Sequence, residues 1–284
     1  MSTSYDLVIV GAGLSALSAI RAGLADGEML LLDYQEAPGG FLRHALPAPG
    51  FEDAWELIRS LRFPRSMATS FSTTAVGLLP APAEGEPHRL LVRQRQGTLE
   101  IQAHRLLIAC GGLELTREHA QIPGSRPAGV MTPILAHQLL ARGYLPGKRA
   151  VVYGHSCYTT ITARRLMQVG MEAILVDPAQ SELVAVEGFP RLQQVMLRRK
   201  DSGELQHIAA DVLVYGTGMQ ANTRWLKGSG VLLRPGGAIQ VDERYQTSVR
   251  GIYATGTVVS PSLDHTDSLW MGKKMASLLA GGQA

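Results

Sequence analysis

Three small residues and one acid are spaced like a nucleotide-binding turn. Gly11, Gly13 and Ala16 directly follow an apolar run, and Asp33 ends the next apolar run. In a strand, turn and helix of this kind, the first glycine permits a tight turn. The second lets the backbone approach a pyrophosphate, and the third small residue keeps helix and strand close. A carboxylate roughly 20 residues further on accepts ribose hydroxyls. The pattern predicts a dinucleotide-binding unit; a unit that merely packs is the alternative.

A second turn of the same type has lost part of this pattern. Its strand begins at Lys148, and its turn reads Gly154, His155, Ser156, Cys157, Tyr158, Thr159. Ser156 puts a Cβ where backbone should approach phosphate, and Thr159 crowds the contact between strand and helix. We therefore expect a degraded second site. If a nicotinamide nucleotide binds there, Asp177 at the end of the next strand favours NADH, which has a free ribose.

Composition indicates an ordinary two-domain protein. The chain has 284 residues, of which 45% are hydrophobic and 18% charged, and its net charge of +3 is too small to favour nucleic acid. No apolar run approaches the roughly 18 residues of a membrane span. The first strand starts by residue 5, so we expect no signal peptide and a cytoplasmic location. Two cysteines cannot form a disulfide framework.

The elements that position these residues alternate between strands and helices. We predict an α/β fold with two Rossmann-like dinucleotide-binding domains, the second inserted into the first, each with a small β meander. The first domain spans 1–115 and 235–284, and the second spans 116–234. Further predicted elements are strands at 90–95, 99–103 and 106–109, a buried strand within 210–218 that ends at Gly216 and Gly218, a connection at 113–133, a hairpin of 193–199 with 204–209, and a helix at 267–279.

Several short motifs together resemble the two-dinucleotide-binding-domain flavoproteins, the class of thioredoxin reductase and the pyridine nucleotide-disulfide oxidoreductases. They are GAGLSA (11–16), Asp33, APGG (37–40), LLIACGG (106–112), VLVYGTG (212–218) and TSVRGIYATGTV (247–258). Within that class, IPGSRPAGVMT and LPGKRAVVYG look closest to the FAD-linked subunits of amine and amino-acid dehydrogenases such as hydrogen cyanide synthase and opine oxidase.

The resemblance implies FAD as the cofactor, with NADH left open. It places the cofactor against these residues: Gly11, Gly13, Leu14, Ser15, Ala16, Asp33, Gly39, Gly40, Phe41, Cys110, Gly111, Gly256 and Thr257. It also implies that N–H groups at the start of the last helix stabilise charge on reduced flavin. One residue departs from the pattern, because Thr257 stands where the family usually has Asp. Its hydroxyl lacks a carboxylate's charge-assisted strength, so either FAD affinity suffers or another adenine nucleotide binds.

Two residues are candidates for catalysis. His265 falls near the implied flavin ring and could donate a proton; helix capping and packing are the alternative. Cys157 falls near a predicted helix N-terminus, which would stabilise a thiolate; a small residue in a turn explains it equally simply. Cys110 ends an apolar strand and is interpreted mainly as a buried hydrophobe. The two cysteines are far apart in sequence, so a local redox dithiol is not expected, and no metal-ligand spacing occurs.

The resulting hypothesis is an FAD-dependent oxidoreductase that passes electrons between flavin and a small molecule or partner protein. One alternative is an NADH-dependent flavin reductase of the same fold. Another is a non-catalytic nucleotide-binding subunit of a multicomponent dehydrogenase. We expect partner subunits of a dehydrogenase complex and an oligomer, with no nucleic-acid or membrane partner.

Overall fold

A computed structural model describes residues 4–24, 27–45 and 47–280, and the chain forms two compact units. Unit 1 comprises Met1–Arg43, Pro49–Leu113 and Met219–Ala284, and unit 2 comprises His44–Ala48 and Glu114–Gly218. The return to unit 1 thus comes at Met219, earlier than the predicted 235. The reason is that Asn222 N–H already donates to Gly111 O at 3.0 Å, and the short helix η2 (Arg224–Leu226) packs on unit 1 strand β4.

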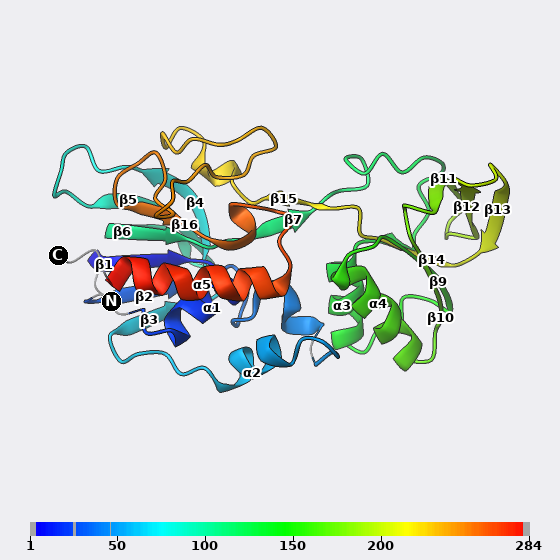
Figure 1. The fold of residues 1–284 in the computed structure, drawn as a ribbon, viewed down its shortest axis with the longest axis horizontal. Helices are drawn as coiled ribbons and strands as arrows, with labels where there is room; N and C mark the ends of the chain where they lie inside the picture. Colours follow the sequence, from blue (N-terminus) through cyan, green and yellow to red (C-terminus); the bar gives the residue numbers. More distant parts are fainter. Residues whose placement is uncertain (1–3, 25–26, 46, 281–284) are drawn as a thin grey trace. The chain divides into compact units, whose positions relative to one another are not determined.

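Unit 1 is built on a seven-stranded sheet (Figure 1). Its strand order is β3 (Met67–Ser70), β2 (Met29–Leu32), β1 (Ser4–Val10), β6 (Gly97–Ile108), β5 (His88–Gln94) and β4 (Thr74–Leu79), with β16 (Ile252–Ala254) pairing the end of β6. Strands β3, β2, β1, β6 and β16 run parallel to one another. The pairs β5–β6 and β4–β5 are antiparallel. Strand β2 and the second half of β1, Leu7–Val10, are apolar and buried, as expected of strands covered on both faces.

Strand β6 corrects the sequence-based prediction of separate strands at 99–103 and 106–109. It is one twelve-residue strand, Gly97–Ile108. Its first half pairs antiparallel with β5, and its second half pairs parallel with β1 and β16. Because different neighbours bind its two halves, both halves stay extended, and the polar pair His104 and Arg105 marks no turn.

Helices α1 (Leu14–Arg21) and α5 (His265–Ala280) pack closely against each other in unit 1. Ser18 Oγ donates to Leu269 O at 2.6 Å. A Cβ at Gly272 would lie 2.2 Å from Ser15 O, so only glycine allows this approach. Helix α2 (Glu52–Ser60) also contacts α1. Unit 1 also contains the short helices η1 (Gly40–His44) and η3 (Gly256–Val258), which carry glycines of the predicted cofactor site.

Unit 2 has a four-stranded parallel sheet in the order β10 (Glu172–Val176), β9 (Arg149–Tyr153), β14 (Val212–Tyr215) and β8 (Val130–Met131). Helices α3 (Pro133–Ala141) and α4 (Cys157–Gln168) pack with it. An antiparallel meander of β11 (Ser181–Glu187), β12 (Gln194–Arg199) and β13 (Leu205–Ala209) lies next in sequence to β10 and contains the predicted hairpin. The predicted α/β class with parallel Rossmann-like sheets is confirmed.

Short strands also occupy the predicted connection. Strand β7 (Gly112–Glu114) pairs β15 (Met219–Ala221), and β8 adds to the sheet of unit 2. Within the described ranges, no helix is both long and apolar enough to cross a bilayer.

Candidate cofactor-binding site

The first glycine turn closes tightly because of Gly11. Its φ is +106°, and a Cβ there would lie 2.4 Å from Ala109 O. Its N–H donates to Leu32 O at 2.8 Å, which ties the turn to the end of β2. Gly11 therefore serves the backbone geometry, since any side chain would be strained and would clash with the backbone of Ala109 and Cys110, just after β6.

Gly13 leaves the N-terminus of α1 open. It is the N-cap, its φ of −81° suits any residue, and no side chain caps the helix. A Cβ at Gly13 would meet only Ala109 O, 4.0 Å away, so the fold itself does not require glycine here. The N–H groups of the first turn have no intrahelical acceptor. Leu14, Ser15 and Ala16 are buried behind this end. The geometry suits a diphosphate held on bare main chain.

Asp33 lies beside the same turn. The residue is 5% exposed, and its Oδ2 accepts from Ala12 N–H at 2.6 Å while its Oδ1 accepts from Gln35 N–H at 2.7 Å. Burial raises the pKa of this carboxyl, and the N–H groups of Ala12 and Gln35 oppose the rise, as does Arg43. Each oxygen retains a further acceptor position for a ribose hydroxyl.

The glycine pair after β2 packs against the turn. Gly39 N–H donates to Ala12 O at 2.9 Å, and a Cβ at Gly40 would lie 3.0 Å from the Gly13 Cα. Gly40 has a φ of +56° and opens η1, which includes the partly exposed Phe41. Gly40 thus lies directly beside the helix N-cap at which a diphosphate would bind.

The strand ends of β6 and β16 complete the same region. A Cβ at Gly256 would lie 2.3 Å from Ser15 Oγ, and one at Gly111 would lie 3.4 Å from Thr257 Oγ1. Every residue that the resemblance implied for the cofactor is in unit 1, where Gly40 lies against Gly13 and Gly256 against Ser15.

Cys110 is held as a neutral thiol. Its Sγ donates to Asn222 O at 3.2 Å, and burial raises its pKa to about 12. The predicted interpretation of Cys110 as a small apolar residue agrees with this environment, because a thiolate is the reactive form of cysteine.

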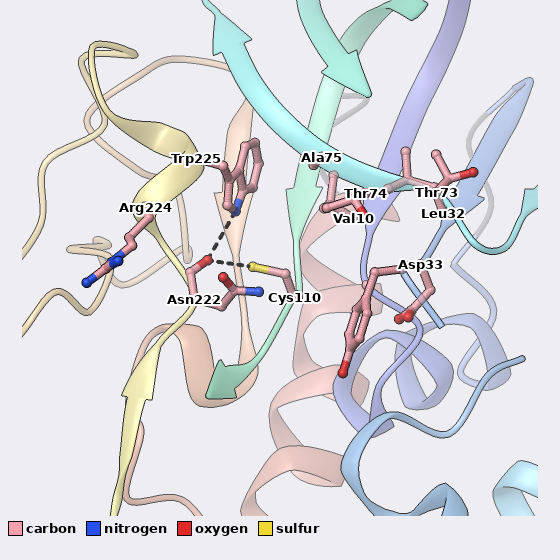
Figure 2. A pocket seen from close by; sticks show the side chains of 12 residues that line it. Val10, Leu32, Asp33, Thr73, Thr74, Ala75, Cys110, Asn222, Arg224 and Trp225 are labelled. Atoms are coloured by element: carbon pink, nitrogen blue, oxygen red, sulfur yellow. Dashed lines mark hydrogen bonds between the residues drawn. The ribbon is translucent and has the colours of Figure 1, made fainter. Parts of the chain in front are cut away.

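A pocket of about 190 Å³ opens beside Gly11 and Asp33 (Figure 2). This volume is smaller than the roughly 300–1,000 Å³ typical of pockets for whole drug-sized ligands. Figure 2 shows Trp225 and Asn222 on one side of Cys110, with Trp225 Nε1 donating to Asn222 O at 3.1 Å. Sequence reasoning missed part of the lining: Tyr34, Thr73, Thr74, Ala75, Asn222, Arg224 and Trp225. Asn222 and Arg224 fall in the segment that the sequence assigned to the other domain.

His265 begins α5 and stacks on Phe51. The ring centroids are 4.0 Å apart, and His265 Nε2 lies 3.7 Å from Asp53 Oδ1. Its Nδ1 is buried and has no hydrogen-bond partner in the described part of the chain. The ring is therefore positioned by α2 residues, and its role as a proton donor stays a prediction.

The start of α5 is closed by a capping box. Asp267 N–H donates to Asp264 Oδ1 at 2.9 Å, and Asp264 N–H reaches Asp267 Oδ2 at 3.4 Å. Asp267 is thus a first-turn acid of α5 that takes part in its capping. The implied stabilisation of reduced flavin by these N–H groups is weakened, because one of them is used and two carboxylates stand at this end.

The second turn keeps its backbone geometry and loses its open helix end. Gly154 N–H donates to Val176 O at 3.0 Å, as Gly11 does to Leu32. Ser156 is the N-cap of α4, and its Oγ accepts from Thr159 N–H at 3.3 Å. The predicted crowding by Thr159 is relieved by its glycine neighbours, since a Cβ at Gly154 or Gly216 would lie 2.6 Å or 2.3 Å from Thr159 Cγ2.

The remaining predicted residues of unit 2 are spread around this turn. Cys157 is the first residue of α4 and is partly exposed. Asp177 Oδ1 accepts from Ala179 N–H at 2.8 Å, in its own loop rather than in the glycine turn. Cys110 belongs to unit 1 and Cys157 to unit 2. In the described ranges, no group of three His, Cys, Asp or Glu is arranged to hold a metal ion.

Comparison with known proteins agrees with this geometry. Residues 180–272 match the pyridine nucleotide-disulphide oxidoreductase family. The chain is 26% identical over 297 residues to a thioredoxin reductase of Treponema pallidum, covering 92% of this chain and 91% of that protein. The structure superposes on T. acidophilum thioredoxin reductase with a TM-score of 0.72 and 20% identity over the full length of both chains. This chain has a thioredoxin reductase-like, two-dinucleotide-binding-domain fold.

Other flavoprotein-type structures share the thioredoxin reductase-like fold. L-proline dehydrogenase from P. horikoshii aligns with a TM-score of 0.75 and 20% identity, covering 98% of this chain and 55% of that one. The chain thus spans about half the length of that protein. The homologues are flavin-dependent oxidoreductases, and members of the family use FAD and NAD(P)H.

Proposed function

We propose that the chain is an FAD-dependent oxidoreductase in which electrons pass between flavin and a small molecule or a partner protein. The uncapped N-terminus of α1 carries this proposal. This helix end has Gly13, which has no side chain, as its N-cap, and Gly40 lies against Gly13. Asp33 and the pocket of about 190 Å³ lie beside the same turn. The thioredoxin reductase-like fold supports FAD as the occupant.

The residues of unit 1 would bind and orient this cofactor. Main-chain N–H groups at the start of α1 would hold the diphosphate, and Asp33 would accept the ribose hydroxyls. Gly39 and Gly40 would lie beside the ribityl chain, since Gly40 lies against Gly13. Bound FAD supplies reversible two-electron transfer, and the protein tunes and shields it. His265, held against Phe51 and Asp53, would donate or accept the accompanying proton at Nε2.

Transfer through a protein dithiol is not part of this proposal. Burial keeps the Cys110 thiol protonated, and Cys157 belongs to the other unit. The substrate class we propose is an amine or amino acid, oxidised within a larger dehydrogenase assembly in the cytoplasm. The short matches at 122–132 and 145–154 and the likeness to L-proline dehydrogenase support this class.

A second candidate is a nucleotide-holding subunit that does no redox chemistry. Thr257 favours it, because Thr257 replaces the family's aspartate at the ribityl contact and its Oγ1 lies near Gly111. Such a subunit would keep the adenosine pocket and lack flavin.

Absorbance of the purified protein, combined with mass spectrometry of the released nucleotide, tests the proposal. We expect a flavin spectrum and FAD in the released fraction. Bound ATP or NAD without flavin would contradict the oxidoreductase and support the nucleotide-holding subunit.

Anaerobic mixing of the purified protein with NADH then tests the flavin reductase alternative. The side-chain cap at Ser156 predicts no bleaching of the flavin over minutes. Rapid bleaching would instead support the NADH-dependent flavin reductase.

A further inference from the structure

Three hydrogen bonds fix the main chain of Asn222 at the pocket of unit 1. Its N–H donates to Gly111 O at 3.0 Å. Its carbonyl oxygen accepts from Cys110 Sγ at 3.2 Å and from Trp225 Nε1 at 3.1 Å (Figure 2). Burial raises the pKa of the Cys110 thiol to about 12, so the thiol stays protonated and able to donate. The Asn222 backbone is therefore held through both its N–H and its C=O.

The neighbours of Asn222 in the chain are anchored as well. Ala221, the last residue of β15, is buried, and Thr223 is buried with its Oγ1 donating to Gly237 O at 2.7 Å. Asn222 itself is only partly buried and lines the pocket. Its carboxamide forms no hydrogen bond with any described residue of the chain. This side chain thus stands on a fixed backbone with its donor and its acceptor available to a ligand.

Adenine is the base that matches a carboxamide in this position. A carboxamide has an N–H donor and an oxygen acceptor on adjacent groups. Adenine presents the complementary pair, an N6 amino donor next to a ring-nitrogen acceptor, and asparagine can bind both at once. Among the described residues that line the pocket, Asn222 is the one with a side-chain amide. The carboxamide is therefore the lining group best suited to a two-point contact with the base.

The proposed nucleotide would bring its base to this group. Gly11 and Asp33 line the same pocket as Asn222. With the diphosphate at the N-terminus of α1 and the ribose on Asp33, the base lies one glycosidic bond beyond the ribose and enters the pocket.

We propose that the Asn222 carboxamide recognises the adenine base of the bound nucleotide, accepting from its N6 amino group and donating to a ring nitrogen. Cys110 and Trp225 are positioning residues, which hold the carboxamide in place through the Asn222 carbonyl oxygen. The inference rests on the proposed cofactor site and adds the residues that select adenine there. It applies equally to FAD and to another adenine nucleotide, because both carry the same base.

Removing the N6 amino group from the ligand and the carboxamide from the protein tests the contact. ADP and purine riboside 5′-diphosphate, which lacks only that amino group, are titrated by calorimetry into full-length protein stripped of nucleotide. We expect the wild type to prefer ADP, and Asn222→Leu to lower this preference about fivefold, because one neutral hydrogen bond is lost. Gln240→Leu removes an exposed amide of unit 1 outside the pocket and should keep the wild-type preference.

The preference decides the test, since a general disturbance of the pocket would weaken the binding of both ligands alike. A folded Asn222→Leu that keeps the wild-type preference, or a wild type that shows no preference, would overturn the inference. The flavin spectrum of the purified protein tests the proposed function independently. Protein that carries ATP without flavin and prefers ADP through Asn222 would contradict the oxidoreductase and support the contact with adenine.

The second test addresses the two positioning residues. Cys110→Ala deletes a donor to Asn222 O, whereas Cys110→Ser keeps a hydroxyl donor in the same place. We expect the preference for ADP to fall about twofold or more in Cys110→Ala and to be retained in Cys110→Ser. If circular dichroism shows that Cys110→Ala does not fold, Trp225→Phe makes the same test by deleting the other donor. An unchanged preference in a folded variant that lacks either donor would refute the positioning role.

Discussion

The two glycine turns share a backbone and differ at the helix that follows. In both, the first glycine donates to the last residue of the next strand, Leu32 or Val176. Helix α1 then starts at Gly13 with no side-chain cap, whereas α4 starts at Ser156, whose hydroxyl accepts from Thr159 N–H. The glycine that shapes the turn and the residue that opens it to a ligand are therefore separable features.

The neighbouring helix of unit 2 is closed as well. At the start of α3, Glu114 accepts from Ile134 N–H at 3.0 Å and 3.2 Å through its two carboxylate oxygens. In each of the two described helices of unit 2, α3 and α4, a side chain thus accepts from one N–H of the first turn, whereas no side-chain hydrogen bond caps α1.

The largest expected effect comes from the first glycine of each turn. Gly11→Ala and Gly154→Ala should each cost several kcal/mol of unfolding free energy. The added methyl would lie 2.4 Å from Ala109 O or 2.6 Å from Gly216 O, at a positive φ. Thermal and denaturant unfolding measure this cost. Gly23→Ala, with a φ of +92° and no atom within 4 Å, is the control and should lose only roughly 1–2 kcal/mol. Equal losses of unfolding free energy at all three glycines would contradict the claim that the close packing of the two turns requires glycine.

Glu114 gives unit 2 a pH dependence of stability. Burial raises the pKa of Glu114 to about 7 from 4.5. Because the folded pKa is higher than the unfolded one, its contribution is complete below about pH 4.5 and is lost as pH rises through 7. The loss is at most about 3 kcal/mol. Glu114→Gln keeps an oxygen for Ile134 N–H, so its unfolding free energy should fall less than that of the wild type over this range. Exposed Glu204→Gln is the control, and parallel wild-type and Glu114→Gln profiles would contradict the assignment.

Removing the side-chain cap at the N-terminus of α4 should make the second glycine turn resemble the first. Ser156→Gly with Thr159→Ala removes the side-chain cap and the methyl that packs on Gly154 and Gly216. We expect NADH to bind this double variant about tenfold more tightly than the wild type, as measured by calorimetry. Asp177 stays in place to accept the ribose, so NADPH should not gain in the same way. No gain for NADH would show that the cap is not what closes the second site.

The smallest effect concerns Thr257. Thr257→Asp restores the carboxylate that the family usually carries, so FAD should dissociate a few-fold more slowly from the variant, because hydrogen bonds to an ionised acceptor are stronger. Ser260→Asp, in the loop just after η3, serves as a charge control. A faster flavin release from Thr257→Asp than from the control would place the ribityl chain elsewhere.

Local sequence predicted the turns well because their chemistry is local. Strand, glycine and helix are adjacent in the chain, so Gly11, Gly13 and Asp33 could be assigned together. The continuity of β6 could not be predicted, because it depends on β5, β1 and β16, which bind different halves of the strand.

Only part of the pocket lining could be predicted from the sequence, because the rest depends on segments that are distant in the chain. Thr73 to Ala75 reach the pocket at the start of β4, and Asn222, Arg224 and Trp225 reach it through the early return of the chain to unit 1. Neither segment carries a motif of its own. The side-chain cap at Ser156 was a missed signal, since serine before a helix is a favoured N-cap.

The most direct test of the account is the FAD content of Gly13→Val compared with the wild type and with Ser156→Val. A Cβ at Gly13 meets no atom of unit 1 closer than 4.0 Å, so the variant should fold. We predict that Gly13→Val purifies folded and without FAD, while the wild type and Ser156→Val each carry FAD. A folded Gly13→Val that retains full FAD would contradict the placement of the cofactor on the first turn.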